Sequence, residues 1–326
     1  MITTEQSFNI STGYRGEVGT TTVMQYLTYI IGGLGLFGNG FVIVVILSER
    51  AMRKQFTNGY IINQSVVDAL CGLCLILSTA FENDGRKFDT VLDEIYCRIW
   101  LTKAPIWCFF VSSTYNLIAL TFERYLSIVH PVWHKTKLTK GKVVASMVLI
   151  WTFGIFLNLV YIVPTAGITA DGDCTAYTIW PNLLTQRAVG VLIIFIQFLM
   201  PLCLLILFYS KMFFVLRHRV SSEGGHSPGQ RKKDVLAGAR KNILKTLAIV
   251  AGCFVFCWIS NQVYFLLYNL GLKGFGLANS FHSFTIVLVF INCCINPLIY
   301  FVKYEQFQKA AKTLILRRTT PNLLSQ

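Results

Sequence analysis

Residues 112–134 (SSTYNLIALTFERYLSIVHPVWH) decide the fold class of this chain. An apolar run with small polar residues leads into Glu123-Arg124-Tyr125, and Pro131 stops the helix because it lacks a backbone N–H. A carboxylate beside a guanidinium at the end of an apolar helix indicates a membrane boundary. There the arginine reaches water, or a partner that arrives from that side. The stretch therefore predicts a membrane-spanning helix that presents Arg124 at one end.

The composition of the whole chain indicates a membrane protein. Of its 326 residues, 54% are hydrophobic and 13% are charged, whereas a soluble domain carries about 25% charged residues. With about 20 apolar residues for one crossing, the candidate spans are 26–47, 59–79, 99–128, 143–162, 188–216, 243–267 and 281–300. These spans have helix length and lack the alternating segments of a membrane barrel. We expect an all-α membrane protein, a seven-transmembrane helix bundle.

The formal charge of +14 is distributed unevenly between the two ends of these spans. If the first tail lies outside, the inner segments hold 22 of the 29 lysines and arginines, which is the positive-inside pattern. This one-sided excess indicates a membrane protein with its N-terminus outside and argues against a nucleic-acid partner. The expected parts are an extracellular tail (1–22), a seven-span domain (23–302), an amphipathic helix on the inner leaflet (303–316) and a short cytoplasmic tail (317–326).

The extracellular segments carry two expected modifications. The first tail lacks the basic start and apolar core of a cleavable signal peptide, so the first span is expected to act as the insertion signal. Asn9 begins an Asn-Ile-Ser glycosylation sequon in this tail. Eight of the ten cysteines fall inside predicted spans, where they act as small apolar filler. Cys97 and Cys174 fall in outer loops that face an oxidising compartment, so we expect one disulfide between them.

Asp68 lies near the middle of the second span, where a carboxylate is costly and is a candidate functional group. Two interpretations stay open: a neutral acid in a polar cluster, or a carboxylate that coordinates a cation. Hard cations take oxygen ligands, and by analogy the candidate ion is sodium, as the only cofactor. The residues that could form this sodium and water site with Asp68 are Asn39, Ser113, Asn292 and Asn296.

The loops allow weaker expectations. His130 and His134 are four residues apart, but Pro131 interrupts their helix, so we expect no metal site there. The acids of the outer loops, Asp171 and Asp173 among them, either create a field that favours a cationic partner or are merely solvated. The basic loop 217–240 is rich in glycine and serine and predicts a flexible connection.

At this point the chain resembles the rhodopsin-like (class A) G-protein-coupled receptors over nearly its whole length. The motifs that carry the resemblance occur in order along the spans: Gly38-Asn39, Asn63 with Asp68, Cys97 with Cys174, Glu123-Arg124-Tyr125, Trp151, Pro201 with Tyr209, Phe254 with Cys257-Trp258, Asn296-Pro297 with Tyr300, and Phe307. Each motif alone is weak. Their order on seven spans makes coincidence negligible.

The resemblance implies a plasma-membrane receptor without enzymatic activity. It would bind an extracellular ligand and activate heterotrimeric G proteins, with arrestin and membrane lipids as further partners. Arg124 would be held by Glu123 at rest and released for the G protein, and Trp258 would lie beneath the ligand pocket. The residues implied in G-protein coupling or activation are Glu123, Arg124, Tyr125, Val132, Tyr209, Arg240, Asn296, Pro297 and Tyr300.

Three features depart from the pattern of these receptors. Ser260 stands where the sixth span usually has a proline, so the hinge of that helix must come from elsewhere. Arg240 stands where some members carry an acid that locks the arginine, so this lock is expected to be absent, which favours basal activity. Cys97 lies 27 positions before Arg124, farther than usual, which leaves the alignment at the top of the third span open.

The absence of two side chains that other receptors use argues against an amine ligand and against retinal. Ile106 occupies the position where amine receptors carry an aspartate, and Phe290 the position of the retinal lysine of opsins. The acidic outer loops and the aromatic, amide-lined pocket are similar to peptide receptors of the galanin, allatostatin and somatostatin neighbourhood, so we expect a neuropeptide. The candidate pocket residues are Lys103, Ile106, Trp107, Phe110, Gln197, Trp258, Asn261, Gln262, Phe265, His282 and Ile286.

Other functions compete with this interpretation. Within the same family, the ligand could be a non-peptide small molecule or a lipid. A secondary transporter or channel would use Asp68 as its ion site, but it needs a continuous polar path, and the sequence shows clustered polar residues and no internal repeat. An intramembrane enzyme needs a catalytic pair, and the sequence offers none.

Overall fold

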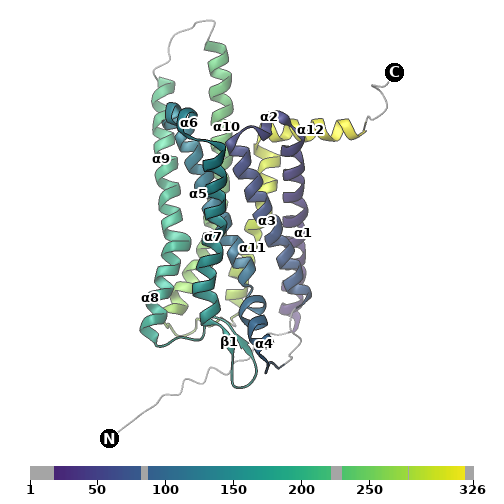
Figure 1. Ribbon diagram of the computed structural model, residues 1–326, viewed down its shortest axis with the longest axis vertical. Helices are drawn as coiled ribbons and strands as arrows, with labels where there is room; N and C mark the ends of the chain where they lie inside the picture. The colour runs from purple at the N-terminus through teal and green to yellow at the C-terminus, as the bar shows by residue number, and fades with distance from the viewer. Residues whose placement is uncertain (1–17, 82–86, 222–229, 278, 320–326) are drawn as a thin grey trace.

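The computed structural model describes residues 18–81, 87–221, 230–277 and 279–319, and the side chains of 18–21, 218–221, 230–241, 243 and 317–319 lie outside this description. Within it, seven helical segments are long and apolar enough to cross a membrane. They are Thr22–Ser48, Phe56–Ala80, Val91–Val129, Lys140–Thr165, Leu183–Arg217, Leu244–Asn269 and Ser280–Lys303. The predicted seven-helix bundle is therefore confirmed (Figure 1).

The spans consist of a series of long helices with short elements between them. The long helices are α1 (Val18–Ser48), α3 (Phe56–Ala80), α5 (Ala104–Val129), α7 (Lys140–Thr165), α8 (Leu183–Ile194) with α9 (Met200–Ser221), α10 (Gln230–Asn269) and α11 (Ser280–Lys303). The short helices are α2 (Arg50–Arg53), α4 (Val91–Tyr96), α6 (Pro131–Lys137) and α12 (Glu305–Thr319). β1 (Gly167–Ile168) and β2 (Cys174–Thr175) form an antiparallel hairpin.

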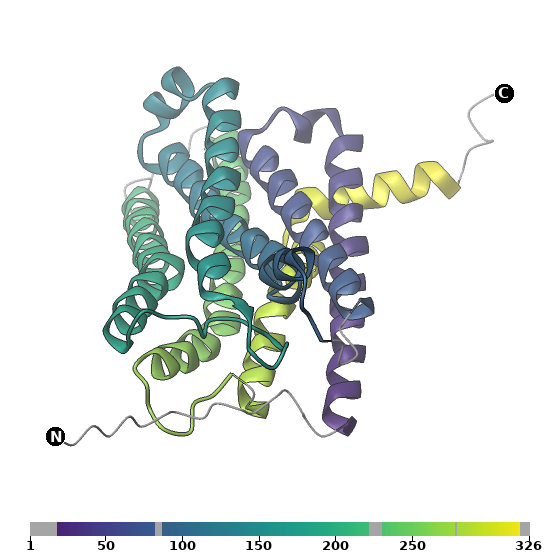
Figure 2. The same ribbon diagram turned by 60° about the horizontal axis from the view of Figure 1, so that its bottom comes forward.

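The short elements distinguish the two ends of the bundle. Figure 1 shows α2, α6 and α12 at one end, and α4 with β1 at the other. We call the first the Arg124 end, because Arg124 lies near the end of α5 there, and the second the disulfide end. Figure 2 shows the loop that carries β1 and β2 lying across the disulfide end. α5 packs against α3, α7 and α9, so it connects most of the bundle.

Polar side chains start several of these helices. The first turn of a helix leaves N–H groups without a partner, and a side-chain oxygen just before the helix satisfies one of them. α4, α7, α8 and α11 all begin in this way, at Thr90, Thr139, Asn182 and Asn279. At these four helices, the residue just before the helix therefore determines where the helix begins.

Glycines allow the helices to cross closely. A Cβ atom on Gly72 of α3 would lie 2.6 Å from the carbonyl oxygen of Gly32 on α1. A Cβ atom on Gly154 of α7 would lie 2.8 Å from the carbonyl oxygen of Cys108 on α5. Small residues that bring backbones together are a main device for packing helices in lipid. These two crossings fix α1 against α3 and α7 against α5.

Two wider turns interrupt the helices. The π-helical turn Phe195–Leu199 joins α8 to α9 just before Pro201, which has no N–H to bond the carbonyl of Gln197. This turn is where the helix departs from regular α-helical geometry next to Pro201. A second π-helical turn, Cys97–Leu101, precedes α5, and Lys103 then adopts a left-handed conformation with φ of 58°. This irregular segment accommodates the long spacing between Cys97 and Arg124.

α12 leaves the bundle sideways at the Arg124 end (Figure 1). Phe307 and Ala311 are buried, whereas Lys309 and Lys312 are exposed, so the helix is amphipathic as predicted. Tyr304, which precedes it, donates a hydrogen bond of 3.0 Å to Asn58 of α3. Burial raises the pKa of this phenol to about 12, so it remains a donor at physiological pH.

The prediction of a flexible loop at 217–240 is wrong for most of these residues. α9 continues to Ser221 and α10 begins at Gln230, so helix occupies both sides of residues 222–229, which lie outside the described part of the chain. Charged residues at the ends of long helices are compatible with a helix that extends beyond the membrane into water. The hydropathy that defined the spans could not register these polar helical turns.

The crossing of α1 and α3 gives a test of this packing. We expect Gly72→Ala to destabilise the purified protein by about 1–3 kcal/mol, because the added methyl meets backbone atoms rather than a side chain that can move. The matched control is Gly33→Ala, since a Cβ atom there has nothing within 4 Å. Thermal unfolding in detergent measures the difference. Equal midpoints for the two variants would contradict the close crossing.

Candidate functional site

Glu123 and Arg124 form a tight ion pair at the Arg124 end. Arg124 Nε lies 2.6 Å from Glu123 Oε2, and its Nη2 lies 2.8 Å from Oε1. The side chain of Glu123 is only 2% exposed, and that of Arg124 is 14% exposed. A buried carboxylate needs donors for all of its lone pairs. In the structure, therefore, the guanidinium of Arg124 contacts the carboxylate of Glu123, as expected for the resting state.

Two further donors complete the shell of Glu123. The hydroxyl of Thr57 on α3 donates to Oε2 at 2.8 Å, and Nε2 of His134 on α6 lies 2.8 Å from Oε1. Thr57 is fully buried and the His134 side chain is 18% exposed. The carboxylate thus ties α5 to α3 and to the helix that follows Pro131. Neither partner was predicted: the sequence analysis considered His134 only as a metal ligand, which it rejected, and gave Thr57 no role.

The other residues implied in coupling lie around this pair. Tyr125 packs against Phe208 with ring centroids 5.3 Å apart and lies within 3.2 Å of His130 Nε2. Val132 is 74% exposed and lines a surface hollow of about 480 Å³ beside α6. The side chain of Arg240 lies outside the described residues, as does Asn9.

The end of α11 contributes the next group. Pro297 lies inside α11 and packs on α1, where a Cβ atom on Gly38 would lie 3.3 Å from its ring. Tyr300 follows one turn later, and its buried hydroxyl has no hydrogen-bond partner within the described chain. Tyr209 lies half-buried on α9 and packs against the core that contains Tyr300. Both tyrosines thus belong to the inside of the bundle near Arg124.

Asp68 lies at the centre of the bundle and is 1% exposed. Asn296 on α11 donates to its Oδ2 at 2.8 Å. Gln64, one turn earlier on α3, places Nε2 3.3 Å from Oδ1 and 3.2 Å from Oδ2, and the same nitrogen donates to the hydroxyl of Ser113 on α5. The donors of this carboxylate are therefore amide nitrogens on α3 and α11.

A hydrogen-bonded chain leads from Gln64 to the far side of the bundle. Asn116 on α5 donates to Gln64 Oε1 at 2.7 Å and accepts from Asn63 at 2.8 Å. Trp151 on α7 in turn donates to Asn63 at 3.1 Å. These bonds join α3, α5 and α7 at the level of Asp68. Gln64 and Asn116 were missed by sequence reasoning, although a glutamine inside an apolar span was a visible signal that a polar partner was needed.

The remaining residues expected around Asp68 are placed differently. The amide of Asn39 donates to the carbonyl oxygens of Gly35 and Cys293, at 2.7 and 2.8 Å, and thereby ties α1 to α11. Asn292 is buried one turn before Asn296. Asp68, Ser113 and Asn296 are brought together, whereas Asn39 is engaged by backbone groups.

All the hydrophobic candidates for the ligand pocket except Phe265 form one cluster in the core of the bundle. Phe110 contacts Trp258 edge-on at 5.8 Å, stacks on Phe290 at 6.0 Å, and lies 6.0 Å from Trp107 between ring centroids. Ile106, 1% exposed, and the half-buried Ile286 belong to the same core. Along α5 and α11, Phe110 and Phe290 lie nearer the disulfide end than Ser113 and Asn296 do.

The polar candidates are dispersed around this cluster. Asn261 donates to Thr285 on α11 at 3.2 Å, and His282 lies 2.9 Å from the carbonyl oxygen of Leu277. Gln262 is buried, and its Oε1 has no partner among the residues that the structure describes. Lys103 and Gln197 are half-buried, each in or beside one of the π-helical turns.

A loop tyrosine occupies the space between α7 and α10. Tyr177, after β2, packs against Tyr161 and Phe265, each at 5.6 Å between ring centroids. Its φ of 59° is unusual for a residue with a side chain, and Tyr268 donates to its carbonyl oxygen at 2.9 Å. The hydroxyl of Tyr161 is buried without a partner among the described residues. Phe265 is thus covered by this loop, which sequence reasoning did not anticipate.

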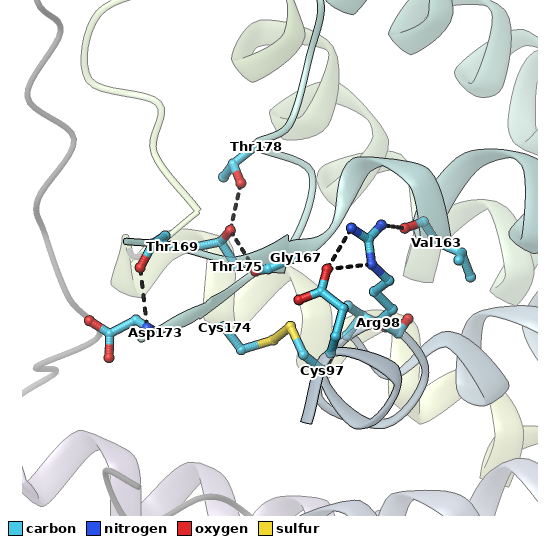
Figure 3. The surroundings of a disulfide bond; sticks show 11 residues. Cys97, Arg98, Val163, Gly167, Thr169, Asp173, Cys174, Thr175 and Thr178 are labelled. Atoms are coloured by element: carbon cyan, nitrogen blue, oxygen red, sulfur yellow. Dashed lines mark hydrogen bonds and ion pairs between the residues drawn. A yellow bond between two sulfur atoms is a disulfide. The ribbon is translucent and has the colours of Figure 1, made fainter. Parts of the chain in front are cut away.

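The expected disulfide is present at this end. Cys97 and Cys174 are bonded, with Cα atoms 5.6 Å apart, and they attach β2 to the start of the third span. Figure 3 shows Arg98 beside this bond, where its guanidinium bridges Glu94, at 2.6 Å, and the carbonyl oxygen of Val163, at 2.6 Å. α4, the hairpin and the end of α7 are therefore fastened together.

Comparison with known proteins adds the family. The model of the "7 transmembrane receptor (rhodopsin family)" matches residues 38–300. This chain belongs to the rhodopsin family of seven-transmembrane receptors. The predicted resemblance to rhodopsin-like, class A G-protein-coupled receptors is thereby confirmed.

Several curated receptors are similar to this one over most of its length. The somatostatin receptor type 2 of Sus scrofa is 26% identical over 310 residues, covering 92% of this chain and 78% of its own. The alpha-1A adrenergic receptor of Oryzias latipes is 24% identical over 318 residues, covering 86% of this chain. The histamine H2 receptor of Canis lupus familiaris is 26% identical over 301 residues, covering 90% and 79%. This receptor spans only 64% of the adrenergic receptor's length.

The disulfide of the receptor gives a second test. We expect Cys174→Ser to destabilise the folded receptor by about 2–4 kcal/mol, because it frees a closed loop with a sequence separation of 77 residues. The measurement is the thermal midpoint of the purified protein together with the yield of folded receptor. The matched control is Cys203→Ser, since Cys203 is free and exposed on α9. A midpoint as high as that of the control would contradict a stabilising role for the bond.

Proposed function

We propose that this chain is a receptor that binds an extracellular peptide and activates heterotrimeric G proteins at the plasma membrane. In this proposal the N-terminus is extracellular and the Arg124 end faces the cytosol. The asymmetric distribution of lysine and arginine supports this orientation, since 22 of 29 fall in the segments assigned to the inside. The observation that carries the proposal is the ion pair of Glu123 and Arg124 at that end.

The geometry of this pair supports a switch based on exchange of partners. Arg124 is held by one carboxylate, and that carboxylate keeps two other donors, Thr57 and His134, if the guanidinium leaves. Glu123 therefore stays partly satisfied in the membrane interior when Arg124 turns to new acceptors. A G protein that offers such acceptors would bind the open conformation better than the resting one, and an agonist would act by the same differential affinity. Arrestin would compete for the same end.

The ligand class belongs to the same proposal. Ile106 is buried in the aromatic cluster, and the described acids at the disulfide end lie on α4 and the neighbouring loops rather than within the bundle core. Glu94 and Asp173 are already paired, with Arg98 and Lys87, which weakens the field expected to attract a cationic ligand. The relatives are named for adrenergic ligands, somatostatin and histamine, so they do not select one class. A peptide fits the loop-rich, aromatic end without a fixed anionic anchor.

Nucleotide exchange in membranes tests the signalling role. We expect Arg124→Ala to abolish receptor-dependent G-protein nucleotide exchange while it leaves the folded yield unchanged, because Arg124 is near the surface and its pair partner retains other donors. Lys135→Ala, an exposed charge on α6 that has no role in the pair, is the matched control. Exchange that persists in Arg124→Ala at equal receptor density would overturn the role of Arg124.

The absence of an acid at position 240 gives a test of basal signalling. We expect wild-type receptor to show ligand-free exchange, and Arg240→Glu to reduce it several-fold by offering Arg124 a second carboxylate. Lys241→Glu introduces the same charge change one residue farther along α10 and should leave basal exchange unchanged. Equal exchange in all three receptors would show that this position does not restrain Arg124.

The ligand is tested by screening the wild-type receptor against a peptide library, with basic peptides included, and against lipid and small-molecule collections. A peptide agonist whose potency falls at least tenfold in Phe265→Ala, but not in Phe281→Ala at an exposed position at the start of α11, supports a peptide site at the disulfide end. A lipid or small-molecule agonist in place of any peptide would replace this part of the proposal and leave G-protein coupling intact.

A further inference from the structure

The amide nitrogen of Gln64 lies among the oxygen atoms expected to bind a cation. It is 3.3 and 3.2 Å from the two carboxylate oxygens of Asp68, and it also donates to the hydroxyl of Ser113. Gln64, Asp68 and Ser113 are each at most 3% exposed. Three oxygen atoms of the proposed sodium site thus converge on one nitrogen of the protein itself.

An amide nitrogen and a metal ion compete for the lone pairs of the same oxygens. Sodium would need these oxygens as ligands at the centre of the cluster, as hard cations do. The NH2 group of glutamine fills that position with two N–H donors, which carry partial positive charge toward the carboxylate. A second amide, Asn296 Nδ2, donates to Asp68 at 2.8 Å. The residues present therefore do not fit a bound cation in this arrangement.

The orientation of the Gln64 amide follows from its other contact. Its Oε1 accepts a hydrogen bond of 2.7 Å from Nδ2 of Asn116. Asn116 is fixed in turn, because it also donates to the carbonyl oxygen of Tyr60 and accepts from Asn63. A reversed amide would place Gln64 Oε1 against the carboxylate of Asp68 and Nε2 against the donor Asn116. Both new contacts would be repulsive, so the network selects the observed orientation.

We propose that the side-chain amide of Gln64 replaces a bound cation at Asp68, so that this receptor does not take sodium at its centre. The amide gives Asp68 what an ion would give it: positive potential and directed contacts inside lipid. It also links α3 to α5 through Ser113 and Asn116 without any diffusible component. The stability of the receptor is then independent of sodium, whichever ligand or G protein it uses.

Thermal unfolding in different salts tests this proposal without a ligand or a G protein. The full-length purified receptor is unfolded in sodium chloride, potassium chloride and choline chloride at one ionic strength, about 0.15 M, which keeps general screening constant. We expect the wild-type midpoint to be the same in all three salts. Gln64→Leu replaces the amide with an apolar side chain of similar size, so Asp68 Oδ1 and the hydroxyl of Ser113 lose this donor and become available to an ion. We expect its midpoint to rise by about 2 °C or more in sodium alone.

Two controls assign the effect to this site. Gln64→Leu combined with Asp68→Asn should lose the sodium-specific shift, because the carboxylate is gone. If Gln64→Leu does not fold, Gln64→Met serves as the second variant, since it is also unable to donate. A sodium-specific shift in the wild type that disappears in Asp68→Asn would overturn the proposal. A folded Gln64→Leu or Gln64→Met receptor whose midpoint of thermal unfolding is the same in all three salts would also overturn it. Because the readout is stability, loss of G-protein coupling in any variant would not be mistaken for either result.

Discussion

The structure depends on one constraint: a carboxylate inside a membrane bundle must find enough donors within the protein. Asp68 and Glu123 both meet it, at 1% and 2% exposure. Their donors come from different helices, so each carboxylate fixes how its neighbours are rotated and at what depth they pack. Asp68 joins α3 to α11, Gln64 extends this contact to α5 through Ser113, and Glu123 joins α5 to α3 and α6. Since no water is available inside lipid, a bundle that slipped by one residue would leave these groups unpaired at a cost of several kcal/mol.

Close backbone packing makes these contacts reachable. Gly32 and Gly72 bring α1 and α3 together, and Gly38 makes room for Pro297, so that Asn39 reaches a carbonyl oxygen on α11. The π-helical turns serve the same purpose along the helix axis. They absorb the extra residues after Cys97 and the missing donor of Pro201 and leave the remaining turns in phase. Small residues and irregular turns therefore position the polar side chains on which the bundle depends.

The sequence was sufficient for the spans, the disulfide and the ion pair, because each follows from local information. Hydropathy predicts the spans, loop location pairs Cys97 with Cys174, and the family resemblance implies the contact between Glu123 and Arg124, which are neighbours in the chain. The cross-helix partners could not be derived in this way. His134 reaches Glu123 only because α6 folds back after Pro131, and Gln64 reaches Asp68 and Ser113 only at one rotation of α3 against α5. The same limit explains why Tyr177, a loop residue, was not expected to cover Phe265.

The two carboxylates differ in how easily their donors can leave. The donors of Asp68 are amides on buried side chains, and Gln64 also accepts a hydrogen bond from Asn116, so Gln64 cannot leave without breaking that second contact. Arg124 is different, because its guanidinium borders the exposed end of the bundle and Glu123 keeps Thr57 and His134 when it departs. Gln64 is therefore held by more contacts than Arg124, and an exchange of partners is easier at Arg124 than at Gln64. If Arg124 exchanges partners as proposed, the exchange takes place at the end of the bundle that another protein can reach.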